Sequence, residues 1–376
     1  MAKLGDICIQ ITDGSHNPPM GVEQSNYLML SSKNIDDDHI TFNDPRYLSQ
    51  EDFEAENKRT NIKPNDLLIT IVGTIGRVAI VPNSLTEFCV QRSVAVLKPK
   101  PEMVYNRFLM YYLQNMRPYL EQESRGVAQK GIYLKQLSNL SIILPPLDEQ
   151  RKIAAALDKV SDLIAKRRQQ LDKLDELIKA RFVEMFGKRF PECTLLSLCN
   201  IIDYRGKTPQ KVDFGLPFIT AKNIRMHRMV LEPKEYISKE TYDKVMVRGF
   251  PKEGDVVFTT EAPLGNVCRI PHFDTEFYVG QRIVTLQTTA LHPAYLEYAL
   301  DTEEFKKKIA EKSSGSTVAG IRVRLLEQLT IPVPPLDLQN QFAAFVEQTE
   351  KTKTTISKSL EKLETLKKAL MQEYFG

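Results

Sequence analysis

Apolar residues recur at seven-residue intervals in two long stretches of the chain. In the first stretch, one heptad position holds Leu157, Ile164, Leu171, Ile178 and Met185, and the other holds Val160 and Leu174. In the second stretch, the two positions hold Val346, Leu360 and Tyr374, and Ile356, Leu363 and Leu370. This spacing is typical of a long α-helix that packs one narrow face against another helix. Charged residues recur throughout both stretches, so neither is predicted to span a membrane.

The two stretches are copies of one segment. Residues 144–187 begin LPPLDEQRKIAAALDKVSDLI, and residues 333–376 begin VPPLDLQNQFAAFVEQ. The copies align without a gap, and the step from Pro145 to Pro334 is half of the 376-residue chain. The sequence is therefore a duplication, and this repeat is the first feature that any fold must explain.

Each copy predicts one helix with recognisable ends. Paired prolines precede it, and Asp148 and Asp337 stand where an N-cap carboxylate would accept from the first free N–H groups. Gly187 is predicted to close the first helix in left-handed geometry. A helix over Glu149–Phe186 would be roughly 57 Å long, more than a small domain needs.

So narrow an apolar stripe needs a partner, and the other copy is the simplest one. Arg167, Lys353 and Lys367 interrupt the stripe, so the seam is imperfect. The alternative is two separate amphipathic helices, each packed on its own domain.

The remaining sequence forms two globular units, residues 1–143 and 188–332. The first predicts mixed α and β structure. Its elements are strands at Leu67–Val72, Val78–Val81, Ser93–Lys98 and Leu140–Leu144, and a helix over Tyr105–Met116.

The second unit repeats this plan with different loops. Matched positions are structural in type: Lys33-Asn34-Ile35 with Lys222-Asn223-Ile224, Gly76 with Gly265, and Gln91-Arg92 with Gln281-Arg282 after a one-residue slip. The loops Thr12–Gln24 and Asp203–Gly215 differ, as do Arg125–Lys130 and Ser314–Ala319. One scaffold with two loop sets predicts two binding surfaces of the same kind but different selectivity.

Composition narrows the class of protein. The net charge of +3 is mildly basic, which is compatible with nucleic acid but decides nothing. The five cysteines form no CxxC pair, so we expect reduced thiols in a cytoplasmic protein without a zinc site. The N-terminus lacks a long apolar core, and we expect no signal peptide.

Catalytic motifs are weak. Asn17-Pro18-Pro19-Met20 resembles the Asn-Pro-Pro-aromatic motif of adenine-N6 methyltransferases, but Met20 replaces the aromatic residue. No strand–GxG–helix unit for S-adenosylmethionine, no P-loop and no nuclease carboxylate pattern is found. The five histidines lack metal-ligand spacing. We predict no catalytic and no metal-binding residue.

Basic and amide side chains gather near the loops and are the candidate DNA-binding residues. Arginine and lysine neutralise phosphates, and arginine, asparagine and glutamine pair with base edges. The candidates in the first unit are Ser15, His16, Asn17, Lys33, Asn34, Arg77, Arg92, Arg125, Gln129 and Lys130. Those in the second are Arg205, Lys207, Lys222, Asn223, Arg225, Asn266, Arg282 and Arg322. Lys33, Asn34 and Arg92 recur in both halves, so they are predicted to serve the scaffold or phosphates. The predicted readers of base sequence are Ser15, His16, Asn17, Arg125, Gln129 and Lys130 in the first unit and Arg205, Lys207, Arg225, Asn266 and Arg322 in the second.

Taken together, the chain resembles the specificity subunit of a type I restriction–modification system over its whole length. The resemblance lies in the repeated Pro-Pro-Leu-x-x-Gln helix start and in the phrases GTIGRVAIVP and GDVVFTTEAPLGNV. It implies an α+β protein with two repeated mixed α/β target recognition domains, residues 1–143 and 188–332. Two long helices, residues 144–187 and 333–376, would separate them as an antiparallel coiled coil that sets the gap of a split DNA site.

The resemblance also implies partners. The chain would have no catalysis and no cofactor of its own, and would bind double-stranded DNA but no membrane. Two methyltransferase subunits would use S-adenosylmethionine to methylate adenine, and a restriction subunit that uses ATP and Mg²⁺ can join them. The alternatives are a duplicated DNA- or protein-binding scaffold outside restriction, or a free-standing DNA methyltransferase or nuclease.

Overall fold

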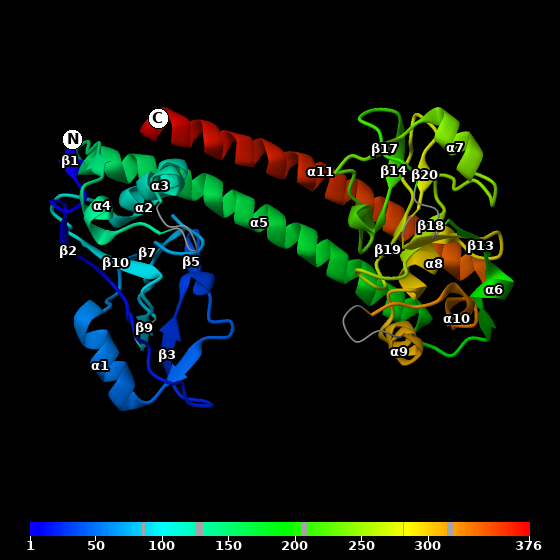
Figure 1. Cartoon of the computed structure of the whole chain (residues 1–376), viewed down its shortest axis with the longest axis horizontal. Helices are drawn as coiled ribbons and strands as arrows, with labels where there is room; N and C mark the ends of the chain where they lie inside the picture. Colours follow the sequence, from blue (N-terminus) through cyan, green and yellow to red (C-terminus); the bar gives the residue numbers. More distant parts are fainter. Residues whose placement is uncertain (85–86, 125–130, 205–208, 281, 314–318) are drawn as a thin grey trace. The chain divides into compact units, whose positions relative to one another are not determined.

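The computed structural model describes residues 1–84, 87–124, 131–204, 209–280, 282–313 and 319–376 (Figure 1). The chain folds into two compact units. Unit 1 comprises Met1–Arg168 and Lys358–Gly376, and unit 2 comprises Gln169–Ser357. Both boundaries fall inside the long helices, so each unit contains a portion of both helices.

Unit 1 is built on a four-stranded antiparallel sheet in the order β2-β10-β7-β8. These strands are β2 Cys8–Asp13, β10 Val94–Pro99, β7 Leu67–Thr70 and β8 Val78–Ile80. A second sheet, β6-β3-β9, joins β6 Arg46–Leu48, β3 Tyr27–Leu30 and β9 Phe88–Val90, with β3 and β9 parallel. Two pairs complete the unit: β4 Ile35–Asp36 with β5 His39–Ile40, and β1 Ala2–Lys3 with β11 Ser141–Ile142.

The central strand β7 is buried on both faces because its apolar run is continuous. Leu67 and Ile69 belong to the core that contains Phe108 of a covering helix. Leu68, which points the opposite way, joins a second core with Leu30. The helices of unit 1 other than the long ones are α1 Gln50–Thr60, α2 Asn106–Asn115, α3 Arg117–Glu123, α4 Leu134–Ser138 and the 3-10 turn η1 Ser32–Asn34.

Unit 2 repeats this topology strand for strand. Its four-stranded sheet has the order β13-β21-β18-β19, with β13 Asn200–Asp203, β21 Ile283–Gln287, β18 Val256–Thr259 and β19 Val267–Arg269. The second sheet joins β17 Tyr236–Ile237, β14 Leu216–Ile219 and β20 Tyr278–Val279. The two pairs are β15 Ile224–Arg225 with β16 Arg228–Met229, and β12 Glu192–Thr194 with β22 Thr330–Pro332. Its shorter helices are α6 Leu195–Leu198, η2 Ala221–Asn223, α7 Lys239–Val245, α8 Pro293–Ala299, α9 Glu303–Lys312 and α10 Val323–Leu326.

The long helices are α5 Leu147–Phe186 and α11 Leu336–Phe375. In unit 2 they run antiparallel, because Asp175 of α5 pairs with Lys353 of α11 at 2.6 Å and Phe182 stacks edge-on against Phe342. In unit 1 they also run antiparallel, because Arg168 pairs with Glu364 at 2.7 Å and Phe375 joins the core that contains Ala154. The predicted pairing of the two copies is therefore confirmed within each unit.

Some of the heptad positions predicted from sequence are buried in the structure. Leu157, Val160, Ile164, Ile178 and Val346 are buried. The lysines that interrupt the stripe find partners at its edge. Lys353 contacts Asp175 and Glu350, and Lys367 lies 3.6 Å from Asp38 and over the ring of Tyr111.

The glutamine of the repeated helix start has the same role in both units. Gln150 is fully buried, accepts from the Tyr105 amide at 2.8 Å and donates to the Pro145 carbonyl at 2.8 Å. Gln339 accepts from the His292 amide at 2.8 Å and donates to the Pro334 carbonyl at 2.8 Å. Each amide therefore ties the start of a long helix to the start of a neighbouring helix.

Three predicted helix ends are wrong in detail. The helices begin at Leu147 and Leu336, so Asp148 and Asp337 are first-turn residues and not N-caps, although their charge still complements the helix dipole. Gly187 is not in a left-handed conformation. It is needed for space, because a Cβ there would lie 2.6 Å from the carbonyl oxygen of Val183.

Candidate nucleic-acid interface

Several loops of unit 1 meet at one end of its four-stranded sheet. The Ser15 amide donates to the Val90 carbonyl at 2.9 Å, and the Arg92 amide donates to the Ser15 carbonyl at 2.8 Å. Ser93 accepts from the Ile71 amide through its carbonyl and from the Ser32 amide through its hydroxyl. The loops that follow β2, β3, β7 and β9 thus form one continuous surface.

Unit 2 brings together the corresponding loops. The Thr260 amide donates to the Arg282 carbonyl at 2.8 Å, and the Ile321 amide donates to the Thr260 carbonyl at 2.9 Å. The Gly280 amide donates to the Ile219 carbonyl at 3.1 Å, which places η2 beside them. Loops that follow corresponding strands of the two units, β3, β7 and β9 in unit 1 and β14, β18 and β20 in unit 2, therefore meet at the same end of the same scaffold.

The tight turn between β7 and β8 shows how the scaffold is held constant. Gly76 and its counterpart Gly265 both have positive φ, at 82° and 92°. Their amides donate to the carbonyls of Thr70 and Thr259 at 2.8 and 2.9 Å. Glycine adopts this geometry without steric cost, which explains why it is retained in both halves.

Four predicted residues of unit 1 lie together on this surface. Ser15 and Arg92 are joined through their backbones, and the Arg92 side chain is exposed. His16 Nε2 is hydrogen-bonded to Asp13 Oδ2 at 2.7 Å, and Asn17 is exposed in the same loop. Their side chains are accessible to a ligand at this end of the sheet.

Two other predicted residues, Lys33 and Arg77, already have partners. Lys33 pairs with Asp44 at 2.6 Å on the surface. Arg77 pairs with Asp36 at 2.8 Å and is about one-third exposed. Each side chain is therefore already paired with a carboxylate of unit 1.

Asn34 and its counterpart Asn223 are scaffold residues in this structure. Both are 1% exposed. The Asn34 side-chain amide donates to the Asn43 carbonyl at 3.0 Å, and the Asn223 side-chain amide donates to the Val230 carbonyl at 2.9 Å. Neither side chain reaches the surface to contact a base directly, so a base-contacting role does not fit either residue.

Of the predicted residues in unit 2, Lys222, Arg225 and Arg322 are exposed. Asn266 donates to the Ile224 carbonyl at 2.9 Å, as Arg77 does to the Ile35 carbonyl at 3.5 Å in unit 1. Arg282 has positive φ, 66°, and pairs with Glu261 at 3.2 Å. The structure thus brings Arg225 and Asn266 together, and Arg282 lies on the neighbouring loop.

The five remaining candidates, Arg125, Gln129, Lys130, Arg205 and Lys207, lie outside the described residues. The residue that follows one of these segments, Gly131, bridges Val72 beside the loop surface. Their role stays a prediction.

The Asn-Pro-Pro-Met loop is hydrogen-bonded to another part of unit 1. Arg46 donates to the Pro19 carbonyl at 2.7 Å, and Met20 is 93% exposed. One of the two proline carbonyls of this motif therefore already has a donor within unit 1.

Sequence reasoning missed Arg228 and His227, which lie in the short β15–β16 hairpin of unit 2. His227 contacts Glu297 and Asp301 at 3.0 Å each. Burial works against its charged form, but the hydrogen bonds to both carboxylates outweigh burial and raise the pKa of His227 above its ordinary value. Comparing the two halves position by position across this hairpin would have exposed both residues.

Nucleophilic chemistry is disfavoured at four of the five cysteines. Burial raises the pKa of Cys8, Cys89, Cys199 and Cys268 to about 12, so these thiols are neutral at physiological pH. Within the described ranges, no group of three or more His, Cys, Asp or Glu side chains could hold a metal ion. In the same part of the chain, no helix is long and apolar enough to cross a membrane.

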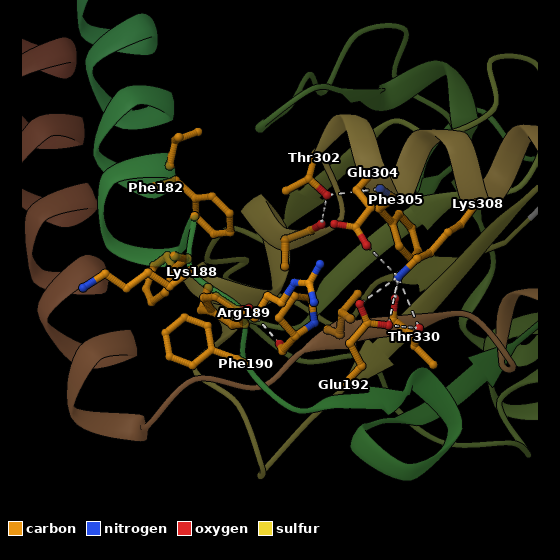
Figure 2. Close-up of a pocket in the computed structure, with 17 residues that line it drawn as sticks. Phe182, Lys188, Arg189, Phe190, Glu192, Thr302, Glu304, Phe305, Lys308 and Thr330 are labelled. Atoms are coloured by element: carbon orange, nitrogen blue, oxygen red, sulfur yellow. Dashed lines mark hydrogen bonds and ion pairs between the residues drawn. The ribbon is translucent and has the colours of Figure 1, made fainter.

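A cavity of about 480 Å³ lies elsewhere in unit 2, between the end of α5 and helices α8 and α9 (Figure 2). Phe182 and Phe186 form its apolar wall. Lys308 lies on the opposite side, where it contacts Glu192 at 3.0 Å and Glu304 at 3.2 Å. None of the predicted DNA-binding residues lines this cavity, so it is separate from the loop surface.

Comparison with known proteins agrees with this arrangement. The family model described as the type I restriction modification DNA specificity domain matches residues 24–176 and again residues 192–367. The MjaVIII specificity subunit of Methanocaldococcus jannaschii is 23% identical over 351 residues, 84% of this chain and 79% of the relative. The EcoBI specificity subunit of Escherichia coli is 34% identical over 128 residues, 34% of this chain and 27% of that protein.

Solved structures share the fold. An S subunit of a type I restriction–modification system from M. genitalium matches with a TM-score of 0.59 and 14% identity, covering 100% of this chain and 95% of that one. A chain from a study of complex assembly in the type I system matches with a TM-score of 0.54 and 18% identity, covering 100% and 96%.

Proposed function

Because the chain belongs to the family of type I restriction–modification DNA specificity proteins, we propose that its two units each read one half of a split DNA site. The chain supplies sequence specificity within the type I system. Unit 1 reads one half-site through the loops around Ser15 and Arg92. Unit 2 reads the other through the loops around Arg225 and Arg282.

One observation carries this proposal: two copies of one scaffold present different loops at the same end. A scaffold that is retained while its loops diverge fits two recognition tasks of one chemical kind. Exposed arginine and lysine side chains supply affinity through phosphates, and polar side chains on the divergent loops supply discrimination between bases.

The chemistry belongs to partner subunits in this proposal. Two methyltransferase subunits bring S-adenosylmethionine and methylate adenine at N6. A restriction subunit, which uses ATP and Mg²⁺, can join to cleave unmodified DNA. This chain contributes no catalytic group, and the complex acts in the cytoplasm, where the DNA lies.

Genome-wide mapping of N6-methyladenine, with and without this chain, tests the proposal. Removing the chain should abolish methylation at one split motif and leave all other methylated motifs unchanged. Reintroducing the chain on a plasmid should restore that motif. An unchanged methylome would contradict the proposal.

A second measurement separates the specificity subunit from a free-standing methyltransferase. The purified chain, incubated with DNA and labelled S-adenosylmethionine, should transfer no methyl group. Addition of the methyltransferase subunits should produce transfer. Methylation by the chain alone would contradict the assignment of catalysis to partners.

A further inference from the structure

Two short hairpins occupy the same place in the two units. They are β4–β5 in unit 1 and β15–β16 in unit 2. Their turns are anchored alike: the Asp38 amide donates to the Val78 carbonyl, and the His227 amide donates to the Val267 carbonyl. Both turn residues have positive φ, at 70° and 57°. The backbone is therefore the same in the two units, and only the side chains differ.

The side chains of the two hairpins have opposite charge. Unit 1 has Asp36-Asp37-Asp38-His39, and unit 2 has Arg225-Met226-His227-Arg228. The three aspartates of unit 1 are neutralised internally, by Arg77 at 2.8 Å, Arg117 at 2.5 Å and Lys367 at 3.6 Å, respectively. The carboxylates of the acidic hairpin are thus paired within unit 1, and the hairpin has no arginine or lysine with which to bind an anion.

In unit 2, Arg225 and Arg228 stand directly opposite each other across the hairpin. Both are exposed, and neither has an acidic partner among the residues that the structure describes. Arg225 donates only to the carbonyls of Lys222 and Ile224, at 2.8 and 3.1 Å. Like charges placed opposite each other on a hairpin cost stability, and a bound anion would remove that cost.

The hairpin borders the loop surface of unit 2. It follows η2 directly in sequence. The Asn266 side chain, from the loop that precedes β19, donates to the Ile224 carbonyl at 2.9 Å. Thr260, at the other end of that loop, is bonded to the Arg282 carbonyl. The two arginines therefore lie beside the loops assigned to base recognition.

His227 fixes this hairpin to the body of unit 2. Its ring contacts Glu297 and Asp301 at 3.0 Å each and stacks on Tyr298 with a centroid separation of 4.0 Å. Both carboxylate groups are almost fully buried, with 2% and 6% of the side chains exposed. The turn thus cannot move without breaking a buried ion network.

We infer that the β15–β16 hairpin contacts the DNA phosphate backbone beside the second half-site, and that His227 is the residue that positions it. The inference rests on the proposed function. It assigns Arg228 a role in binding, and it gives Arg225 a phosphate contact in place of the base contact predicted from sequence.

Positioning by His227 depends on its proton. A neutral imidazole has one N–H group, so one of the two carboxylates would face a ring lone pair. Only the imidazolium donates to both. Burial opposes this charge, yet the hydrogen bonds to Asp301 and Glu297 raise the pKa of His227. Both hydrogen bonds donated by His227 are present below the ordinary pKa of histidine. One of them is lost as pH rises through the raised pKa of His227.

Other charged groups face the same network and must be considered in any pH experiment. Lys179 of α5 lies 3.4 Å from Asp301, and Lys306 of α9 lies 2.9 Å from it. Arg269 of β19 pairs with Glu297 at 2.6 Å, and Glu350 of α11 acts electrostatically on Arg269. His227 is the histidine of this network, and, although burial works against its charge, its pKa lies above the ordinary value of histidine because of the hydrogen bonds to Asp301 and Glu297.

The first test removes the two arginines. The full-length Arg225→Ala/Arg228→Ala variant is compared with the wild type on a duplex that carries the methylated split motif, in a series of salt concentrations. If both side chains bind phosphates, the slope of log affinity against log salt should fall by about two. The motif itself should stay unchanged, because no base contact was removed.

The matched control is His39→Ala, which alters the position in unit 1 that corresponds to Arg228. This variant should keep the wild-type salt slope. An equal slope for the double arginine variant and the wild type would overturn the phosphate contact.

The second test examines the positioning role of His227. Affinity of the wild type for the same duplex should fall as pH rises through the pKa of His227, and His227→Arg should bind with a flat profile because it keeps its charge and can stack on Tyr298. His272→Asn alters an exposed histidine and should keep the wild-type profile. A wild-type slope of affinity against pH in the His227→Arg variant would overturn the positioning role.

The experiments distinguish failure of the hairpin assignment from failure of the proposed function. If the wild-type chain directs no split methylation motif, the specificity role itself fails. If the motif is present while the arginine variant keeps its salt slope, only the hairpin assignment fails.

Discussion

The acidic hairpin of unit 1 and the basic hairpin of unit 2 have the same backbone anchor but opposite surroundings. Asp38 lies near Lys367 and Gln114, both on helices of unit 1. His227, at the matching position, lies between Glu297 and Asp301. The two units differ both in the turn residue and in the groups that face it. The turn residue therefore matches the charges around it in each unit, and moving that residue alone into the other unit would lose this match.

This difference separates two kinds of position in the repeat. Backbone positions such as Gly76 and Gly265 are held constant because the turn geometry requires them. Charged positions vary in sets, because a buried charge is tolerated only with its partner. A charged set that lacks an internal partner, such as Arg225 with Arg228, then identifies a place where a ligand supplies the missing charge.

The largest change should come from exchanging a whole unit. Replacing residues 1–143 with the matching segment of a relative should replace one half-site and leave the other half-site intact, because each unit has its own loops. Methylome mapping of the hybrid measures both half-sites at once. A change in both half-sites would contradict independent reading by the two units.

Exchanging the turn residues of the two hairpins, one substitution at a time, tests whether each residue depends on its own surroundings. His227→Asp would place a third carboxylate beside Glu297 and Asp301, and we expect a loss of about 3–5 kcal/mol in the free energy of unfolding. Asp38→His alters a partly exposed group and should cost less than about 1 kcal/mol. Urea unfolding of both variants gives the comparison, and equal losses would contradict it.

The two helix-start glutamines should behave alike. Gln150→Leu and Gln339→Leu each remove a buried amide and leave an amide donor and a carbonyl without partners. We expect each to cost about 1–3 kcal/mol of unfolding free energy. Thermal unfolding of the two variants should show shifts of similar size, whereas a loss confined to one variant would show that the repeat is not equivalent there.

The smallest effect is expected for Lys353→Leu in α11. Lys353 interrupts the apolar stripe and pairs with Asp175 and Glu350 at its edge. Its replacement exchanges ion pairs for apolar contact, so the change in unfolding free energy should lie within about 1 kcal/mol of zero. A loss of several kcal/mol would show that this ion pair is essential to the helix pairing in unit 2.

Several features of the fold followed from local pattern. Heptad spacing predicted the buried positions Leu157, Ile164 and Ile178, and the continuous apolar run at Leu67 predicted the central strand. These predictions succeed because burial of an apolar face is set by periodicity along the chain. The repeat then predicted that both units share one topology, which they do.

Other predictions were incomplete or wrong where the outcome depended on a distant partner. Asn34 was among the DNA-binding candidates and was predicted to serve the scaffold or phosphates; its side-chain amide donates to the Asn43 carbonyl inside the turn, which leaves it the scaffold role. Asp148 looked like an N-cap, but Gln150, held by Tyr105 from another helix, secures the helix start. The sequence does not show whether the hydrogen-bonding groups of a polar residue face solvent or a neighbouring residue.

The sequence by itself determined the duplication, the mixed α and β content of the units and the apolar stripe of each long helix, because each is set by residue type and spacing along the chain. Only the tertiary structure decided which charges are satisfied. Arg77 and Arg228 are both loop arginines in the sequence, yet Arg77 is paired with Asp36 while Arg228 faces Arg225. The energy of a charge depends on what lies within a few ångströms of it, and that neighbourhood is assembled by folding from residues that lie far apart in the chain.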